Sequence, residues 1–198
     1  MHDSARETGR AFFEVYGRPS GIVLDVGSRD VNGTLRPFVP VGMSYCGCDL
    51  EPGPNVNLVL DDPYRLPFGH EEFDLVVSTS CLEHDEFFWL TCAEMARVTK
   101  RGGLIYLSAP TGGAVHRHPV DCWRFYPDAG AALAAWMSRE GYPTTLIESF
   151  IRPPGGEGWS DFVAVLRRDD DEVYRPARLV VDRFPDAVHR CGYAELRT

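Results

Sequence analysis

Two histidines, an aspartate, a tryptophan and an arginine lie within the twelve residues HRHPVDCWRFYP, at positions 116–127. Three kinds of chemistry are open to this segment. A neutral imidazole of His116 or His118 could remove a proton from a reacting group, because histidine titrates near neutral pH. The same imidazoles with Asp121 could bind a divalent transition metal. Alternatively, the segment is a packed loop in which Asp121 and Arg124 form a buried ion pair.

A third histidine, His84, follows the apolar segment FDLVVSTS within CLEHDE. We expect it at the carboxyl end of one strand, beside the segment that follows the next strand. His84 is therefore a further candidate base, or else a helix-start residue that hydrogen-bonds a neighbouring loop. Trp123 and Tyr126 could form apolar walls around a small molecule, or pack against the following helix. Three metal ligands this close in sequence rarely converge without a fourth, so no metal is expected.

Alternating strand-like and helix-like segments must position these residues. The pattern predicts strands at 21–27, 44–50, 56–62, 72–80, 104–110, 144–151 and 160–168, and helices at 4–17, 85–103 and 127–141. Such alternation predicts an α/β fold: a doubly wound, mostly parallel seven-stranded sheet with helices on both faces and one antiparallel edge strand. Residues 1–168 would form the domain, opening with an N-terminal helix within 1–20. The tail at 169–198 could dock on the domain, build an oligomer contact or cover a site.

The first strand and its turn, VLDVGSRDVNG at 23–33, carry the clearest binding signal. A glycine turn at Gly27 lets a ligand approach the backbone, and Asp49 ends the next strand 22 residues later. A carboxylate placed there accepts hydrogen bonds from ribose hydroxyls. The residues after Gly27 lack the second glycine of G-x-G-x-x-G, which brings a pyrophosphate close. The pattern therefore favours a cofactor with a ribose but no phosphate, and disfavours a nicotinamide cofactor.

This order of motifs resembles the class I S-adenosylmethionine-dependent methyltransferases. The resemblance is carried by the Asp-x-Gly turn, Asp49, DDPYRLPF, FDLVVSTSCLEH and EMARVTKRGGLIYLSAP, over about residues 20–168. It is closest to the small bacterial type with Leu-Glu-His after the fourth strand and H-x-x-P-x-D-x-W-R after the fifth. The resemblance implies S-adenosyl-L-methionine as the cofactor, S-adenosyl-L-homocysteine as the product, and no required metal.

The resemblance also implies roles for individual residues. The turn at Gly27 and Ser28 would contact the methionine part of the cofactor, Asp49 would hold the ribose, and Asp62 would accept from the adenine amino group. The implied cofactor-binding set is Asp25, Gly27, Ser28, Asp49, Leu50, Asp61, Asp62, Ser78 and Thr79. One departure from the family pattern is Pro63, which has no N–H to donate to the adenine ring.

The expected activity is methyl transfer to an oxygen or nitrogen of a small-molecule acceptor by in-line displacement. His84, His116 and His118 are the candidate bases, and Asp121, Trp123, Arg124 and Tyr126 form the acceptor side. A non-catalytic S-adenosylmethionine-binding protein, or a methyltransferase acting on protein or nucleic acid, is the alternative.

The composition bounds the partners. The chain has 198 residues, 44% apolar and 25% charged, with a net charge of −9, which is ordinary for one globular domain. The negative charge disfavours nucleic acid and anionic membranes as partners. The N-terminus lacks the apolar core of a signal peptide, so a cytoplasmic location is expected. Six scattered cysteines are expected to be reduced core residues, and a homodimer is an open alternative.

Overall fold

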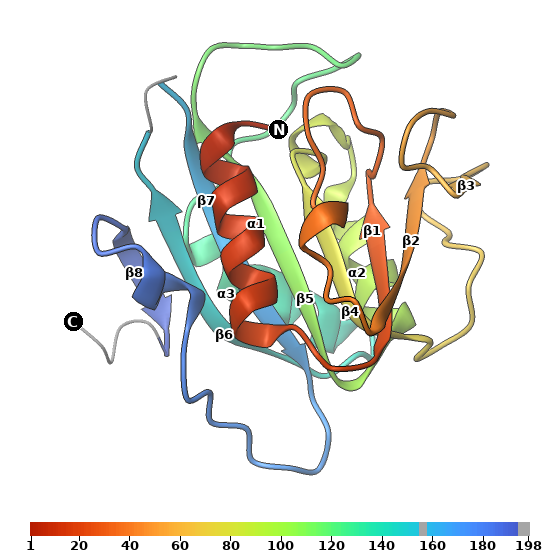
Figure 1. The fold of residues 1–198 in the computed structure, drawn as a ribbon, viewed down its shortest axis with the longest axis vertical. Helices are drawn as coiled ribbons and strands as arrows, with labels where there is room; N and C mark the ends of the chain where they lie inside the picture. The colour runs from red at the N-terminus through yellow and green to blue at the C-terminus, as the bar shows by residue number, and fades with distance from the viewer. Residues whose placement is uncertain (155–157, 194–198) are drawn as a thin grey trace.

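The protein, described here by a computed structural model over residues 1–154 and 158–193, is built on one eight-stranded sheet (Figure 1). The strands are β1 (Gly21–Val26), β2 (Met43–Asp49), β3 (Leu58–Val59), β4 (Phe73–Thr79), β5 (Thr99–Gly112), β6 (Thr144–Arg152), β7 (Ser160–Arg168) and β8 (Val188–Gly192).

The sheet has the order β3-β2-β1-β4-β5-β7-β6-β8. Strands β1 to β5 pair in parallel, whereas β7 runs antiparallel between β5 and β6, and β8 pairs antiparallel with β6. The predicted α/β fold with a mostly parallel sheet and an antiparallel edge is confirmed. The sheet has eight strands rather than seven, because β8 is formed by a short polar segment of the tail that lacks a strand-like pattern.

Helices cover both faces of the sheet. Helix α1 (Asp3–Tyr16) lies on one face, and α2 (Phe88–Val98) and α3 (Asp128–Arg139) lie on the other (Figure 1). Successive side chains of β5 point to opposite faces of the sheet. Ile105 belongs to the core under α2 and α3, and Tyr106 belongs to the core under α1. Two separate hydrophobic cores therefore hold the sheet rigid between them.

The second helix ends earlier than its sequence pattern predicts. The pattern predicts a helix over 85–103, whereas α2 covers only Phe88–Val98 and β5 begins at once with Thr99. Thr99 pairs with the start of β4, so Lys100 lies on a strand instead of at a helix end. Gly102, within the predicted helix range, has φ +74° and lies in β5. Sheet pairing overrides the helix propensity of this short segment.

The connection from β1 to β2 holds no α-helix. Its regular structure is the short 3-10 helix η1 (Arg36–Phe38), as Pro37 and Pro40 predict. Two further 3-10 turns are η2 (Leu82–His84), directly after β4, and η3 (Val180–Arg183) in the tail.

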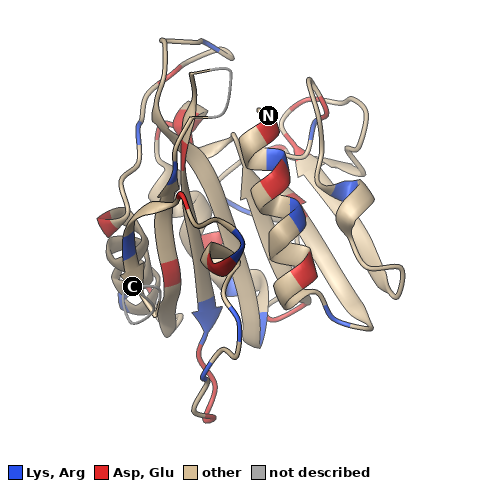
Figure 2. Cartoon of the chain, turned by 60° about the vertical axis from the view of Figure 1, so that its left-hand side comes forward, with Lys and Arg blue, Asp and Glu red and all other residues tan. Residues whose placement is uncertain are grey.

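The tail packs on the same face as α1. Leu179, Val180 and Val181 are fully buried in the core under α1, and β8 extends the sheet beyond β6. The outward surface of α1 carries both acidic and basic residues (Figure 2). Of the alternatives for the tail, the described part up to residue 193 docks on the domain; residues 194–198 lie outside the described residues.

Candidate functional site

The predicted cofactor-binding residues gather at one edge of the sheet. Gly27, Asp49 and Thr79 stand at the carboxyl ends of β1, β2 and β4, and Asp62 follows β3. The strand order reverses between β1 and β4, since the chain builds outward from β1 in one direction and from β4 in the other. Ligands of doubly wound sheets bind in the crevice at such a reversal.

The turn after β1 requires a glycine. Gly27 has φ +79°, and a Cβ atom there would lie 2.4 Å from Cys81 Sγ. The backbone N–H groups of Gly27 and Ser28 both donate to the Cys48 carbonyl oxygen, at 2.9 and 3.1 Å. The turn is therefore fixed against β2, and Cys81 fills the space that a side chain at position 27 would need.

The Asp49 carboxylate is half-buried and keeps capacity for a ligand. Its oxygens accept backbone N–H groups from Arg29 at 3.0 Å and Glu51 at 3.3 Å. An ionised carboxylate can accept about four hydrogen bonds, so two positions stay available for ribose hydroxyls. The next residue, Leu50, is exposed beside it.

Two hydroxyls at this edge lack partners. Ser28 Oγ and Thr79 Oγ1 are buried, and neither has a hydrogen-bond partner within the described residues. Ser78, by contrast, donates its hydroxyl to the Val26 carbonyl oxygen at 2.9 Å, which ties β4 to β1. Unpaired buried hydroxyls are costly in a protein without a ligand. Their presence beside Gly27 and Asp49 fits a polar cofactor in the crevice.

Asp25 lies deeper, inside β1. Its buried carboxylate accepts a hydrogen bond from the Tyr45 hydroxyl at 2.8 Å. Burial raises the pKa of Asp25 from 3.8 to about 7, against the opposing effect of that hydrogen bond. Asp25 therefore supports the glycine turn from within β1, through its hydrogen bond with Tyr45 of β2.

Asp61 and Asp62 lie on the exposed loop after β3. Asp62 Oδ1 accepts the backbone N–H of Tyr64 at 2.8 Å, closing a short turn around Pro63.

His84 is held in one orientation by the loop after β5. Its Nδ1 lies 2.6 Å from the Val120 carbonyl oxygen. Because a carbonyl oxygen only accepts, Nδ1 carries a proton, and Nε2 is the ring nitrogen that faces Glu83. That Nε2 atom is 3.6 Å from Glu83 Oε1.

Glu83 is the residue that the sequence predictions omit. Its side chain is 1% exposed, and its Oε2 has no hydrogen-bond partner within the described residues. Burial raises the pKa of Glu83 from 4.5 to about 7. Its signal was present in the Leu-Glu-His motif, where an acid next to a histidine follows a buried strand. The pattern does not reveal that η2 turns this acid inward.

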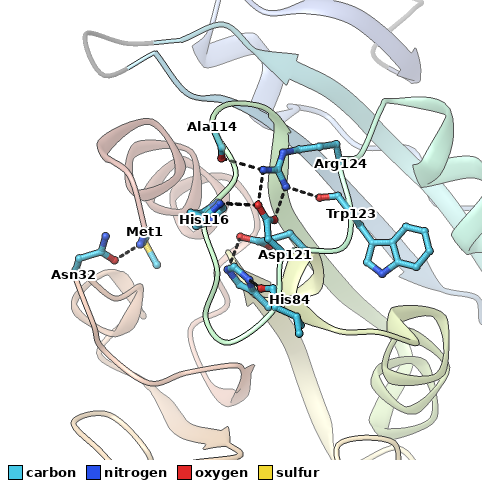
Figure 3. Close-up of polar contacts among 10 residues, drawn as sticks. Met1, Asn32, His84, Ala114, His116, Asp121, Trp123 and Arg124 are labelled. Carbon is cyan, nitrogen blue, oxygen red and sulfur yellow. Dashed lines mark hydrogen bonds and ion pairs between the residues drawn. The ribbon is translucent and has the colours of Figure 1, made fainter.

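His116 lies across from His84 (Figure 3), and His118 is also near. The ring centroids of His84 and His116 are 4.9 Å apart, and those of His84 and His118 are 5.8 Å apart. His116 is half-buried, and burial lowers its pKa below the usual value despite the nearby Asp121. His118 is exposed. The structure thus brings all three predicted bases to one place.

An ion pair fixes the loop that carries them. Arg124 donates to both oxygens of Asp121, at 2.6 and 2.8 Å, and to the Ala114 carbonyl oxygen (Figure 3). Asp121 also accepts the backbone N–H of His116 at 2.8 Å. The Arg124 hydrogen bonds hold the pKa of Asp121 well below its usual range. This is the Asp121–Arg124 pair expected for a packed loop, and it also positions His116.

The aromatic residues border an open groove. Trp123 donates its ring N–H to the Asp85 carbonyl oxygen at 2.9 Å, and Tyr126 is 61% exposed. Together with Phe88 and Phe125 they line a groove of about 560 Å³ between α2 and α3. A flat apolar acceptor has room there.

The possible metal ligands that the structure brings together differ from those suggested by the sequence, which are His116, His118 and Asp121. Asp121 is engaged by Arg124, so it does not form an open set with His116 and His118. Across residues 1–154 and 158–193, the group whose ligand atoms lie within 4.8 Å of one another is Glu83, His84 and His116.

The chain that forms this edge of the sheet is similar to known methyltransferases. Residues 24–107 match the family model of a methyltransferase domain. An uncharacterized methyltransferase of Mycobacterium leprae strain Br4923 is 31% identical over 129 residues, covering 56% of this chain and 48% of the relative. An uncharacterized methyltransferase of Mycobacterium tuberculosis strain H37Rv is 28% identical over 159 residues, covering 71% and 60%. The chain thus spans about half the length of the curated relatives it matches.

The fold has solved counterparts. The 1,6-didemethyltoxoflavin-N1-methyltransferase of Burkholderia thailandensis, solved with 1,6-didemethyltoxoflavin and S-adenosylhomocysteine, aligns with a TM-score of 0.64 at 20% identity, covering 85% of this chain and 79% of that one. The expected resemblance to methyltransferases is confirmed by the family model and the curated relatives, and the solved structure shows that the fold is shared. In the described part of the chain, every helix is too short or too polar to cross a membrane.

Proposed function

We propose that this chain is a class I S-adenosylmethionine-dependent methyltransferase and that it methylates an oxygen or nitrogen of a small-molecule acceptor. The observation that carries the proposal is the crevice at the strand-order reversal. There the glycine turn, the Asp49 carboxylate and two unpaired hydroxyls lie at the carboxyl ends of β1, β2 and β4.

The residues present fit the cofactor. Bound S-adenosylmethionine would supply a methyl group on a positively charged sulfur. Asp49 would accept from the ribose hydroxyls, and Asp62 from the adenine amino group. The buried Ser28 and Thr79 hydroxyls would gain the partners that they lack within the described residues. The turn at Gly27 and Ser28 would contact the methionine part.

The acceptor side is supported by the loop after β5. Methyl transfer needs the acceptor atom, the methyl carbon and the sulfur in line, and it needs water to be kept away. Arg124 and Asp121 fix this loop beside the carboxyl ends of β4 and β5, and Trp123 and Tyr126 supply apolar walls. His84, His116 or His118 would accept a proton from a hydroxyl or a protonated amine.

Isothermal titration with S-adenosylhomocysteine tests the proposal. We expect the wild-type protein to bind one molecule per chain. Asp49→Ala should weaken binding by about 10- to 100-fold, because it removes charge-assisted hydrogen bonds worth about 1.5–3 kcal/mol. Asp128→Ala, an exposed acid at the start of α3, is the matched control and should bind as the wild type does. Absence of binding to the wild-type protein would refute the proposal.

A further inference from the structure

We propose that Glu83, His84 and His116 bind a divalent transition-metal ion beside the cofactor crevice, and that this ion holds an oxygen of the methyl acceptor. The site goes beyond the expectation of a metal-free enzyme. Its acceptor role rests on the proposed function, whereas the ion-binding part stands on the geometry of the three side chains alone.

The spacing of the ligand atoms suits one ion. The three atoms lie within 4.8 Å of one another, and His84 Nε2 is 3.6 Å from Glu83 Oε1. Two ligands of a tetrahedral ion with bonds of about 2.0–2.1 Å lie about 3.3 Å apart. Rotation of the His116 ring, on a loop that Asp121 and Arg124 hold in place, would bring its ligand atom toward that separation.

The orientation of His84 is that of a metal ligand. Metal-binding histidines donate their second ring N–H to a carboxylate or carbonyl oxygen, which fixes the ring and the tautomer. His84 donates Nδ1–H to the Val120 carbonyl oxygen at 2.6 Å, which leaves the Nε2 lone pair directed toward Glu83. Asp121 provides a second such support, since it holds the backbone of His116.

The surroundings of Glu83 are an independent indication that a ligand binds at this point. Its carboxylate is buried, its Oε2 has no partner within the described residues, and no arginine or lysine of those residues forms an ion pair with it at 4.0 Å or less. His116 Nδ1 is likewise buried and forms no hydrogen bond there, although it lies 3.4 Å from Asp121 Oδ2. A buried carboxylate without a partner is costly, whereas a dication at this point would satisfy both groups.

The ligand types indicate which ion binds. Two imidazoles and one carboxylate suit Zn²⁺, Co²⁺, Ni²⁺, Fe²⁺ or Mn²⁺ rather than Ca²⁺, which prefers six to eight oxygen ligands. Three protein ligands leave at least one position open, as in catalytic sites. An acceptor hydroxyl in that position would have a lowered pKa, as metal-bound water does.

The proposed reaction balances in atoms and charge. The acceptor gives up its proton to solvent. The new carbon–oxygen bond forms as the methyl carbon leaves sulfur, and the electron pair of the broken bond stays on sulfur. The products are the methylated acceptor, S-adenosylhomocysteine and one proton.

Titration with Co²⁺ alone tests the site. The full chain, stripped with a chelator and then freed of it, is titrated with Co²⁺ by calorimetry, while the cobalt absorption spectrum shows its ligand types. We expect one ion per chain with nitrogen and oxygen ligands. Glu83→Gln and His116→Gln should each weaken binding by about tenfold or more. His70→Gln, an exposed histidine on the loop before β4, is the matched control and should not change it.

Two results would overturn the site: no Co²⁺ binding to the wild-type protein, or binding that both variants retain and that thiol blocking abolishes. Circular dichroism checks that each variant folds, and His116→Gln keeps the test decisive if Glu83→Gln does not. S-adenosylhomocysteine binding to the chelator-treated protein is measured in parallel. Cofactor binding without Co²⁺ binding would refute only the metal site, and the reverse would refute only the proposed function.

Discussion

Glu148 and Glu83 are two glutamates with the same burial and opposite surroundings. Glu148 is fully buried in β6 and accepts hydrogen bonds from the Tyr16 hydroxyl at 2.7 Å and from the backbone N–H groups of Val180 at 2.8 Å and Val181 at 3.0 Å. Glu83 is 1% exposed after β4, and its Oε2 has no partner within the described residues. The first carboxylate is saturated by the protein, whereas the second has capacity left over.

The difference separates a structural charge from a binding one. The donors to Glu148 come from α1 and from η3, so this carboxylate joins the N-terminal helix, the sheet and the tail. Glu83 lies instead among histidines at the carboxyl edge. When the fold supplies hydrogen-bond donors to a buried acid, that acid has a structural role. When the fold does not supply them, the acid is available to bind a ligand.

Removing the saturated carboxylate should have the largest effect on stability. Glu148→Ala leaves a tyrosine hydroxyl and two backbone N–H groups buried without an acceptor. We expect the free energy of unfolding to fall by about 3–5 kcal/mol. Urea denaturation at neutral pH measures it, and Glu172→Ala, an exposed glutamate of the same tail, is the control. A loss below about 1 kcal/mol would show that Glu148 does not hold the tail.

Asp25 is intermediate between Glu148 and Glu83, because one side-chain donor contacts its carboxylate. Its effect should appear in the pH dependence of the free energy of unfolding. Burial raises its pKa from 3.8 to about 7. Between these values the unfolded chain has lost the proton that the folded chain keeps, so stability falls as pH rises from about 4 to about 7. Asp25→Asn removes this loss and can still accept from Tyr45. Across that pH range, the free energy of unfolding of the variant should rise by about 2–4 kcal/mol relative to that of the wild type.

The measurement is urea denaturation of both proteins at several pH values, taken as a difference so that other titrating groups cancel. A difference that stays constant from pH 4 to pH 8 would mean that Asp25 titrates as an ordinary exposed carboxyl. A difference that grows toward low pH would mean that the folded protein favours the ionised form of Asp25, contrary to the effect of burial.

The unsaturated carboxylate should matter least for stability. Glu83→Gln removes a buried charge and breaks no side-chain hydrogen bond to Oε2 within the described residues. We expect the free energy of unfolding of the metal-free protein to change by less than about 1 kcal/mol. Urea denaturation in the presence of a chelator measures it. A loss as large as that of Glu148→Ala would make Glu83 a structural residue and erase the contrast.

Much of the fold was predictable because it rests on local patterns. The buried strands, the N-terminal helix and α3 each combine an apolar period with end signals. The end of α2 was not predictable, because Thr99 pairs with a strand 26 residues away in sequence. The edge strand β8 was missed for the same reason, since its pairing with β6 is a long-range contact with no apolar alternation behind it.

The site shows the same limit. Spacing alone placed Asp49, Gly27 and the three histidines at one edge, because parallel strands share their carboxyl ends. It did not predict that Glu83 turns inward while Asp121 is taken up by Arg124. Which acid stays unpaired depends on the orientation of η2 and of the loop after β5. That orientation is decided by tertiary hydrogen bonds such as the one between His84 and Val120.

The most direct test of the central claim, that the unpaired groups at the carboxyl edge mark ligand positions, is one crystal structure of the protein with S-adenosylhomocysteine and Mn²⁺. We predict cofactor density across the ends of β1, β2 and β4 with the ribose on Asp49, and an anomalous peak of manganese in contact with Glu83 and His84. Cofactor density away from this edge, or a filled crevice with no anomalous peak at Glu83, would contradict it.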